Sequence, residues 1–152
     1  MNKEESQYRS RSSKYNLQKL SEPFIREFND KLDWICISKY QNLSENFIQE
    51  VANKVGWSLI SQYQNLSEDF IRKFKDNVDW SYISQSQKLS EDFIRELKDK
   101  VKWFNISRCQ KLSESLIREF QDDVVWLWIS QYQQLSEDFI REFKYKVRWE
   151  NI

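Results

Sequence analysis

Residues 66–88 read LSEDFIRKFKDNVDWSYISQSQK, and close variants of this stretch fill most of the chain. Trp recurs every 23 residues from Trp34 to Trp149, and Leu-Ser-Glu recurs in step with it. Leu, Ser, Glu, Ile and Trp each recur in all six copies, and Gln recurs six times at the same spacing, from Gln18 to Gln133. A fixed period of this kind is typical of tandem arrays in which each copy stacks on the next. The copies begin at Leu20, Leu43, Leu66, Leu89, Leu112 and Leu135.

Each copy predicts two short helices. Ser44, followed by Glu45 and then by apolar residues at helical spacing, is a helix start, because the hydroxyl can accept an unpaired backbone N–H. We expect a first helix of about twelve residues, a bend just before the Trp, and a second helix of about eight residues from the Trp through the Gln. Asp33 and Asp79 can cap the second helix in two copies.

Helices this short are not stable alone, so they must be stabilised by stacking on their neighbours. The sequence therefore predicts an all-α protein, a short α-solenoid of six 23-residue helix-turn-helix repeats. The repeat domain is expected to span residues 14–152 and to follow a polar leader at residues 1–13.

Composition argues against most enzyme classes. The 152 residues include 24 basic and 24 acidic side chains, so any charge-driven binding must be local. The chain has no His, which removes the commonest general base and metal ligand. The serines that recur in the second helix have no activating base beside them in the sequence pattern. We expect no catalytic residue, no cofactor, no metal site and no enzymatic activity.

The expected location is the cytoplasm. The longest apolar run, Val124 to Ile129, is far shorter than the roughly 20 residues of a membrane-spanning helix, and the N-terminal residues lack the apolar stretch of a secretory signal. Cys36 and Cys109 occupy different places in the repeat, which fits reduced intracellular thiols better than a disulfide.

The motif LSEDFIREFK, followed by Val-x-Trp and Ile-Ser-x-Tyr-Gln, resembles short tandem repeats in proteins of large DNA viruses of amoebae. The resemblance covers Lys14 to Ile152 and carries no activity that can be transferred to particular residues. It implies a viral factor that acts on a host protein in the host cytoplasm.

Two recurring sets of side chains have a structural and a functional interpretation. The tryptophans and phenylalanines could stack nucleic-acid bases, but they lie on apolar stripes and are expected to form the core between repeats. The arginines could bind phosphate, but each follows a Glu by four residues, so we expect ion pairs on a solvated face. This arginine ladder comprises Arg26, Arg72, Arg95, Arg118 and Arg141.

A third set, the glutamine ladder, lies beside the apolar stripe of the second helix, so each amide should be at least half buried and needs a partner. We expect bonds to loop backbone or to the next Gln, and peptide capture along a groove is the alternative. The ladder begins at Gln18 and continues through Gln41, Gln64, Gln87, Gln110 and Gln133.

The C-terminal copies carry the candidate interaction surface. Leu127 and Trp128 add apolar bulk at positions that are smaller in most other copies, and Trp149 and Ile152 lack the rest of a second helix to cover them. We expect a noncatalytic scaffold that binds another protein, with a homodimer through the C-terminal end as one form of pairing. A nucleic-acid-binding array that uses the arginines and the basic leader, and a self-assembling structural protein, are the alternatives.

Overall fold

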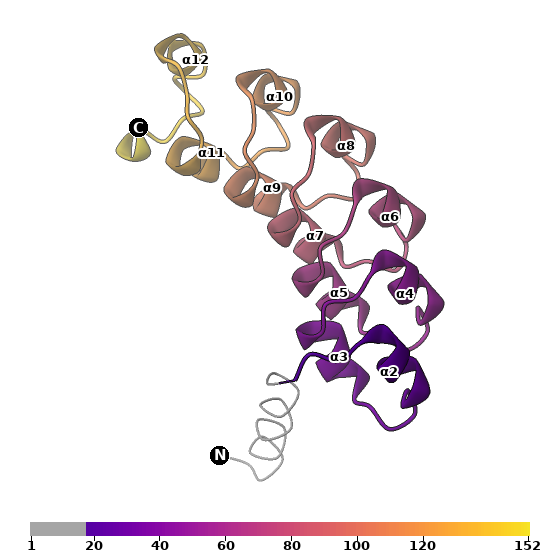
Figure 1. Ribbon diagram of the computed structural model, residues 1–152. Helices are drawn as coiled ribbons and strands as arrows, with labels where there is room; N and C mark the ends of the chain where they lie inside the picture. Colours follow the sequence, from indigo (N-terminus) through magenta and orange to yellow (C-terminus); the bar gives the residue numbers. More distant parts are fainter. Residues whose placement is uncertain (1–17) are drawn as a thin grey trace. The chain divides into compact units, whose positions relative to one another are not determined.

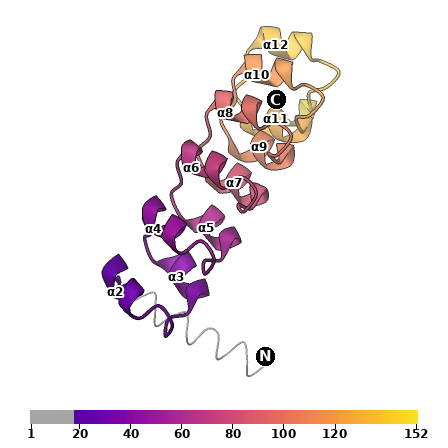
Figure 2. The ribbon, with the colours of Figure 1, turned by 90° about the vertical axis from the view of Figure 1, so that its right-hand side faces the viewer.

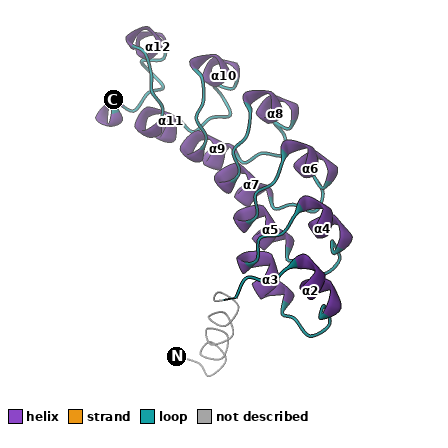
Figure 3. Cartoon of the chain, viewed as in Figure 1, coloured by secondary structure: helices purple, strands orange, loops and turns teal. Residues whose placement is uncertain are grey.

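The computed structural model describes residues 18–152, and over this range every regular element is helical (Figure 3). Six-residue and seven-residue α-helices alternate, which confirms the predicted all-α helical-repeat solenoid. The expected leader at residues 1–13 lies outside the described residues. No helix in the described part of the chain is both long and apolar enough to cross a bilayer.

The chain divides into two compact units, one ending at Val78 and one formed by Asp79–Ile152. In each unit the first helices of the repeats lie in one row and the second helices in another (Figures 1 and 2). The first unit contains α2 (Glu22–Glu27), α3 (Trp34–Tyr40), α4 (Glu45–Glu50), α5 (Trp57–Tyr63) and α6 (Glu68–Lys73). The second contains α7 (Trp80–Ser86), α8 (Glu91–Glu96), α9 (Trp103–Cys109), α10 (Glu114–Glu119), α11 (Trp126–Tyr132), α12 (Glu137–Glu142) and the 3₁₀ turn η1 (Trp149–Asn151).

The first helix of each repeat is half as long as expected. It begins after the predicted Ser cap, whose hydroxyl accepts the N–H three residues on, as Ser113 accepts from Leu116 at 3.2 Å. The helix ends after six residues at Glu119, with Phe120 as its C-cap. The chain then makes one further turn in which the N–H groups of Asp123 and Val124 donate to the carbonyl of Phe120. That turn keeps Val124 in the core without a continuous helix.

Two recurring side chains bond the peptide groups that this break leaves open. In a continuous helix the carbonyl of Gln121 would accept from the N–H of Val125. Instead that carbonyl accepts the indole N–H of Trp126 at 2.9 Å, and the N–H of Val125 donates to the hydroxyl of Ser107 in the preceding repeat at 2.9 Å. The hydroxyls of Ser38, Ser84 and Ser130 accept the equivalent N–H groups of Gly56, Lys102 and Arg148.

The second helices run from the Trp to the residue before the Gln. The Gln is therefore the C-cap and not, as expected, the last helical residue. Asp33 and Asp79 cap α3 and α7 through their carboxylates, as expected. Gly56, Lys102 and Val125 stand at the same position without a side-chain cap, and each gives its N–H to the serine of the preceding repeat.

The core lies between the two rows. An Ile from the second helices is fully buried in every repeat from Ile37 to Ile129. The Trp of one repeat packs against a Phe of the next, as Trp126 does against Phe143 at a ring-centroid separation of 5.0 Å. Trp80 is buried and stacks on Phe93, whereas most of the other tryptophans are half buried. The aromatic rings therefore line the junctions between repeats, as the core interpretation expects.

Replacing Trp80 with Ala should lower the free energy of unfolding by about 3–5 kcal/mol, because the change removes a buried ring between α7 and α8. Urea denaturation followed by far-ultraviolet circular dichroism measures the loss. Tyr145→Ala is the matched control, since Tyr145 is 90% exposed and its loss should change stability by less than about 0.5 kcal/mol. A loss below about 1 kcal/mol for Trp80→Ala would contradict the core role of this ring.

Candidate functional site

The glutamine ladder bonds each repeat to the backbone of the repeat before it. Gln64 is buried; its amide oxygen accepts from the N–H of Leu43 at 3.0 Å, and its amide nitrogen donates to the carbonyls of Ser38 and Gln41 at 2.9 and 2.7 Å. Gln110 and Gln133 repeat this arrangement, and Gln41 makes the equivalent bonds to Leu20 and Gln18.

These bonds match the structural interpretation of the glutamine ladder. A primary amide has two N–H donors and one carbonyl oxygen, and in Gln64 all three groups face backbone partners. Gln87 occupies the same C-cap position and is also buried. Peptide capture by this ladder would require these bonds to break, so the candidate site must be sought elsewhere.

Hydrogen bonds to carboxylates also connect the first helices of neighbouring repeats. The carboxylate of Glu114 accepts the backbone N–H of Ser136 in the next repeat at 2.6 Å. Hydrogen bonds from the backbone and the side chain of Ser136, together with the charge of Arg118, lower the pKa of Glu114. Glu22, Glu45 and Glu91 accept the equivalent N–H groups of Ser44, Ser67 and Ser113.

The arginine ladder is paired, within its own helix and across repeats. Arg95 contacts Glu91 and Asp92 in α8 and donates to Glu119 of the next repeat at 2.7 Å. Arg118 likewise donates to Glu142 at 2.9 Å. The pairs with the preceding Glu were expected, whereas the pairs across repeats were not. With carboxylates on both sides, this row presents no uncompensated cationic stripe to a polyanion.

In both units the second helices differ in charge from the first helices. Residues 34–44, 57–67, 80–90, 103–113 and 126–136, which hold these helices and the loops after them, contain no Asp or Glu. Their charged residues are all basic: Lys39, Lys88, Arg108 and Lys111. A negatively charged ligand would therefore meet no repulsion from these five segments, whereas the turn η1 of the last copy carries Glu150.

An aromatic cluster lies on this row in the second unit, and we call it the α9–α11 surface: Phe104, Arg108, Trp128 and Tyr132. Phe104 meets Trp128 edge-on at 5.6 Å between ring centroids, and Tyr132 stacks on Trp128 at 5.7 Å. The guanidinium of Arg108 lies 5.4 Å from the Trp128 ring. Phe104 and Arg108 are one helical turn apart, as are Trp128 and Tyr132, so the four side chains share one face.

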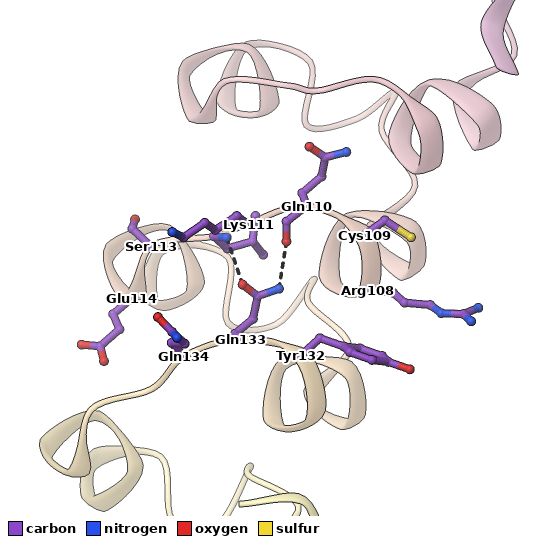
Figure 4. Close-up of a pocket in the computed structure, with 10 residues that line it drawn as sticks. Arg108, Cys109, Gln110, Lys111, Ser113, Glu114, Tyr132, Gln133 and Gln134 are labelled. Atoms are coloured by element: carbon purple, nitrogen blue, oxygen red, sulfur yellow. Dashed lines mark hydrogen bonds between the residues drawn. The ribbon is translucent and has the colours of Figure 1, made fainter. Parts of the chain in front are cut away.

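A hollow of about 690 Å³ adjoins this surface between the ends of α9 and α11 (Figure 4). Arg108 and Tyr132 line it together with Lys111 and Gln134, and Arg108 and Tyr132 point to the same side of the two helices. Neither Arg108 nor Lys111 pairs with a carboxylate in the described part of the chain. The carboxylate at the rim is that of Glu114, whose charge is already met by Ser136 and Arg118.

The structure places the four residues of the candidate interaction surface in two different settings. Leu127 is 37% exposed, and Trp128 is half buried because Phe104, Arg108 and Tyr132 contact its ring. Trp149 and Ile152 are 60% and 52% exposed on the last turn. The sequence analysis did not single out Phe104, Arg108 or Tyr132, and the signal that could have found them is the lack of Asp and Glu in residues 103–113 and 126–136.

Comparison with protein-family models, with curated proteins and with solved structures gave no match. The resemblance to repeat proteins of large DNA viruses therefore stays a prediction.

Replacing Gln64 with Leu should lower the free energy of unfolding by about 3 kcal/mol, because the N–H of Leu43 and two carbonyls then lose a buried partner. Chemical denaturation of the full chain measures the change. Gln85→Leu makes the same substitution at an exposed position of α7 and should shift stability by less than about 0.5 kcal/mol. Equal stabilities for the two variants would show that the glutamine ladder is not needed to hold the repeats together.

Proposed function

We propose that this chain is a noncatalytic helical-repeat scaffold that binds another protein through its second-helix row, in the cytoplasm. The observation that carries the proposal is the α9–α11 surface. Phe104 and Tyr132 are about half exposed there, beside a cation that has no carboxylate partner in the described part of the chain. Aromatic residues with Arg are the side chains most enriched in the energetic centres of protein interfaces.

The absence of a catalytic role is part of the proposal and has structural support. The recurring serines donate their hydroxyl protons to backbone carbonyls, as Ser130 does to Trp126 at 2.8 Å, and accept a backbone N–H from the next repeat. A hydroxyl held in this way, and buried, is not presented to a substrate. The polar side chains that recur most regularly are thus used within the array.

The test compares two double variants of the full chain in affinity capture. Phe104→Ser with Tyr132→Ser removes the exposed aromatic rings of the α9–α11 surface. Ile35→Ser with Tyr63→Ser removes apolar side chains from the same two repeat positions in the first unit, each 47% exposed. We expect a partner that the unmodified chain and the Ile35/Tyr63 variant retain and that the Phe104/Tyr132 variant binds at least about tenfold more weakly when the purified pair is measured.

Circular dichroism first establishes that both variants keep the helical fold. An identical set of captured proteins for all three chains, with equal affinities in the purified pairs, would contradict the proposal. Loss of the partner by both variants alike would point to general apolar adhesion rather than to the α9–α11 surface.

A second copy of the chain is a further candidate partner, because Trp149 and Ile152 are exposed together on the last turn. If they pair, multi-angle light scattering should report a dimer at micromolar concentration, and Trp149→Ser should return it to the mass of one chain. A single-chain mass at high concentration, with solubility unchanged in Trp149→Ser, would remove self-assembly from consideration.

The nucleic-acid alternative has weaker support. The arginines on which it depended are paired with Glu and Asp. Binding to a polyanion would first have to break those pairs.

A further inference from the structure

The α9–α11 surface and the adjoining hollow combine two features that select a ligand class. Phe104 and Tyr132 offer apolar ring surface, and Arg108 and Lys111 offer positive charge that no carboxylate in the described part of the chain neutralises. Residues 103–113 and 126–136 contain no Asp or Glu, and the carboxylate of Glu114 at the rim of the hollow is paired with Arg118 and the N–H of Ser136. Arg108 and Lys111 are therefore the unpaired charges that a negatively charged ligand meets here.

We propose that the α9–α11 surface binds an extended acidic peptide whose carboxylates meet Arg108 and Lys111 and whose apolar side chains lie against Phe104 and Tyr132. This proposal rests on the protein-binding function proposed above and names the chemistry of the partner. The guanidinium of Arg108 can form two parallel hydrogen bonds to one carboxylate, which fixes the orientation of that carboxylate as well as attracting its charge. Lys111, in the loop after α9, supplies a second positive charge at the hollow.

The hollow also offers a polar side chain to a peptide backbone. The hollow lies between consecutive repeats of the second unit and is lined by loop residues 110–113 and 133–134, by the ends of α9 and α11, and by Glu114 at the start of α10. The exposed amide of Gln134 can donate to and accept from a passing peptide backbone. By contrast, the amide of Gln133 is already bonded to Leu112, Ser107 and Gln110.

A single-stranded nucleic acid fits the same surface less well. Binding by base stacking needs a series of free ring faces along the strand. The Trp128 ring is already in contact with Phe104, Tyr132 and Arg108, and the position of Tyr132 is taken by Cys109 and Ser86 in the two preceding repeats. The aromatic surface is therefore local rather than continuous.

The two cysteines provide a reporter for the test. Cys109 is exposed and lines the hollow. Cys36 is buried, and burial together with the charge of Asp33 raises the pKa of its thiol to about 11. Because the thiolate is the reactive form, a maleimide dye at neutral pH should label Cys109 alone.

The binding experiment uses the full chain, dye-labelled at Cys109, and three synthetic probes. The first is a short peptide in which Glu and Asp alternate with Leu and Phe, the second is its Gln and Asn counterpart, and the third is an oligothymidylate. We expect saturable binding of the acidic peptide and at least about tenfold weaker binding of its amide counterpart. Titration calorimetry on unlabelled protein repeats the measurement without the dye in the hollow.

Variants then locate the site. Arg108→Gln and Tyr132→Ala should each lower the affinity for the acidic peptide by about tenfold. Arg141→Gln removes the same charge from the first-helix row of the same unit, where Arg141 is exposed and paired with Glu137 and Asp138, and should change the affinity by less than about twofold. Equal effects of Arg108→Gln and Arg141→Gln would mean that net charge, not this surface, drives binding.

The other outcomes distinguish failure of the acidic-peptide proposal from failure of the scaffold function. Saturable binding of the oligothymidylate without binding of the peptide would overturn the proposal in favour of a nucleic acid. If neither probe binds while the Phe104/Tyr132 variant still loses its captured protein, the acidic-peptide inference fails and the scaffold function stands. If capture also shows no dependence on these residues, both fail.

Discussion

The short helices leave many of their backbone N–H and C=O groups without a hydrogen-bond partner inside the helix. The rest of the structure depends on how side chains, most of them from neighbouring repeats, supply those hydrogen bonds. The last four carbonyls and first four N–H groups of any α-helix lack partners within it, so a six-residue helix consists almost entirely of ends. Ser, Gln, Glu and Trp side chains take up many of these groups. Three of the four types reach across to another repeat, as Ser107 does to Val125 and Gln133 does to the carbonyls of Ser107 and Gln110.

This constraint explains why the period is so regular. A serine accepts an N–H from 18 residues ahead, and a Gln oxygen accepts an N–H from 21 residues behind. An inserted residue would shift both bonds out of register at once and leave buried donors unpaired, at about 1–3 kcal/mol each. The Ser and Gln side chains that set the period are therefore used to hold the repeats together.

The sequence predicts the array, the Ser caps and the position of the bend, because each depends on residues close together in the chain. It does not predict the length of the first helix. Phe24, Ile25, Phe28 and Leu32 fall on one stripe whether the helix continues or breaks into a separate turn, so periodicity alone cannot separate the two cases. The difference lies in the partners of a few peptide groups, and those partners come from another repeat.

The candidate site was harder to find for a related reason. Leu127 and Trp128 can be picked out from the sequence by their size. Arg108 becomes a candidate only when the structure shows that its guanidinium lies over the ring of Trp128 in the next repeat. In the first unit Lys39 lies over the rings of Tyr40 and Tyr63, its neighbours in sequence and in space, and the hydrogen bond to Tyr40 raises the pKa of Lys39. The same repeat position thus carries a cation in both units, and in the second unit it adjoins a hollow of about 690 Å³. Variation at a few solvent-facing positions on a fixed scaffold can in this way make one repeat junction a binding surface and leave another as part of the framework.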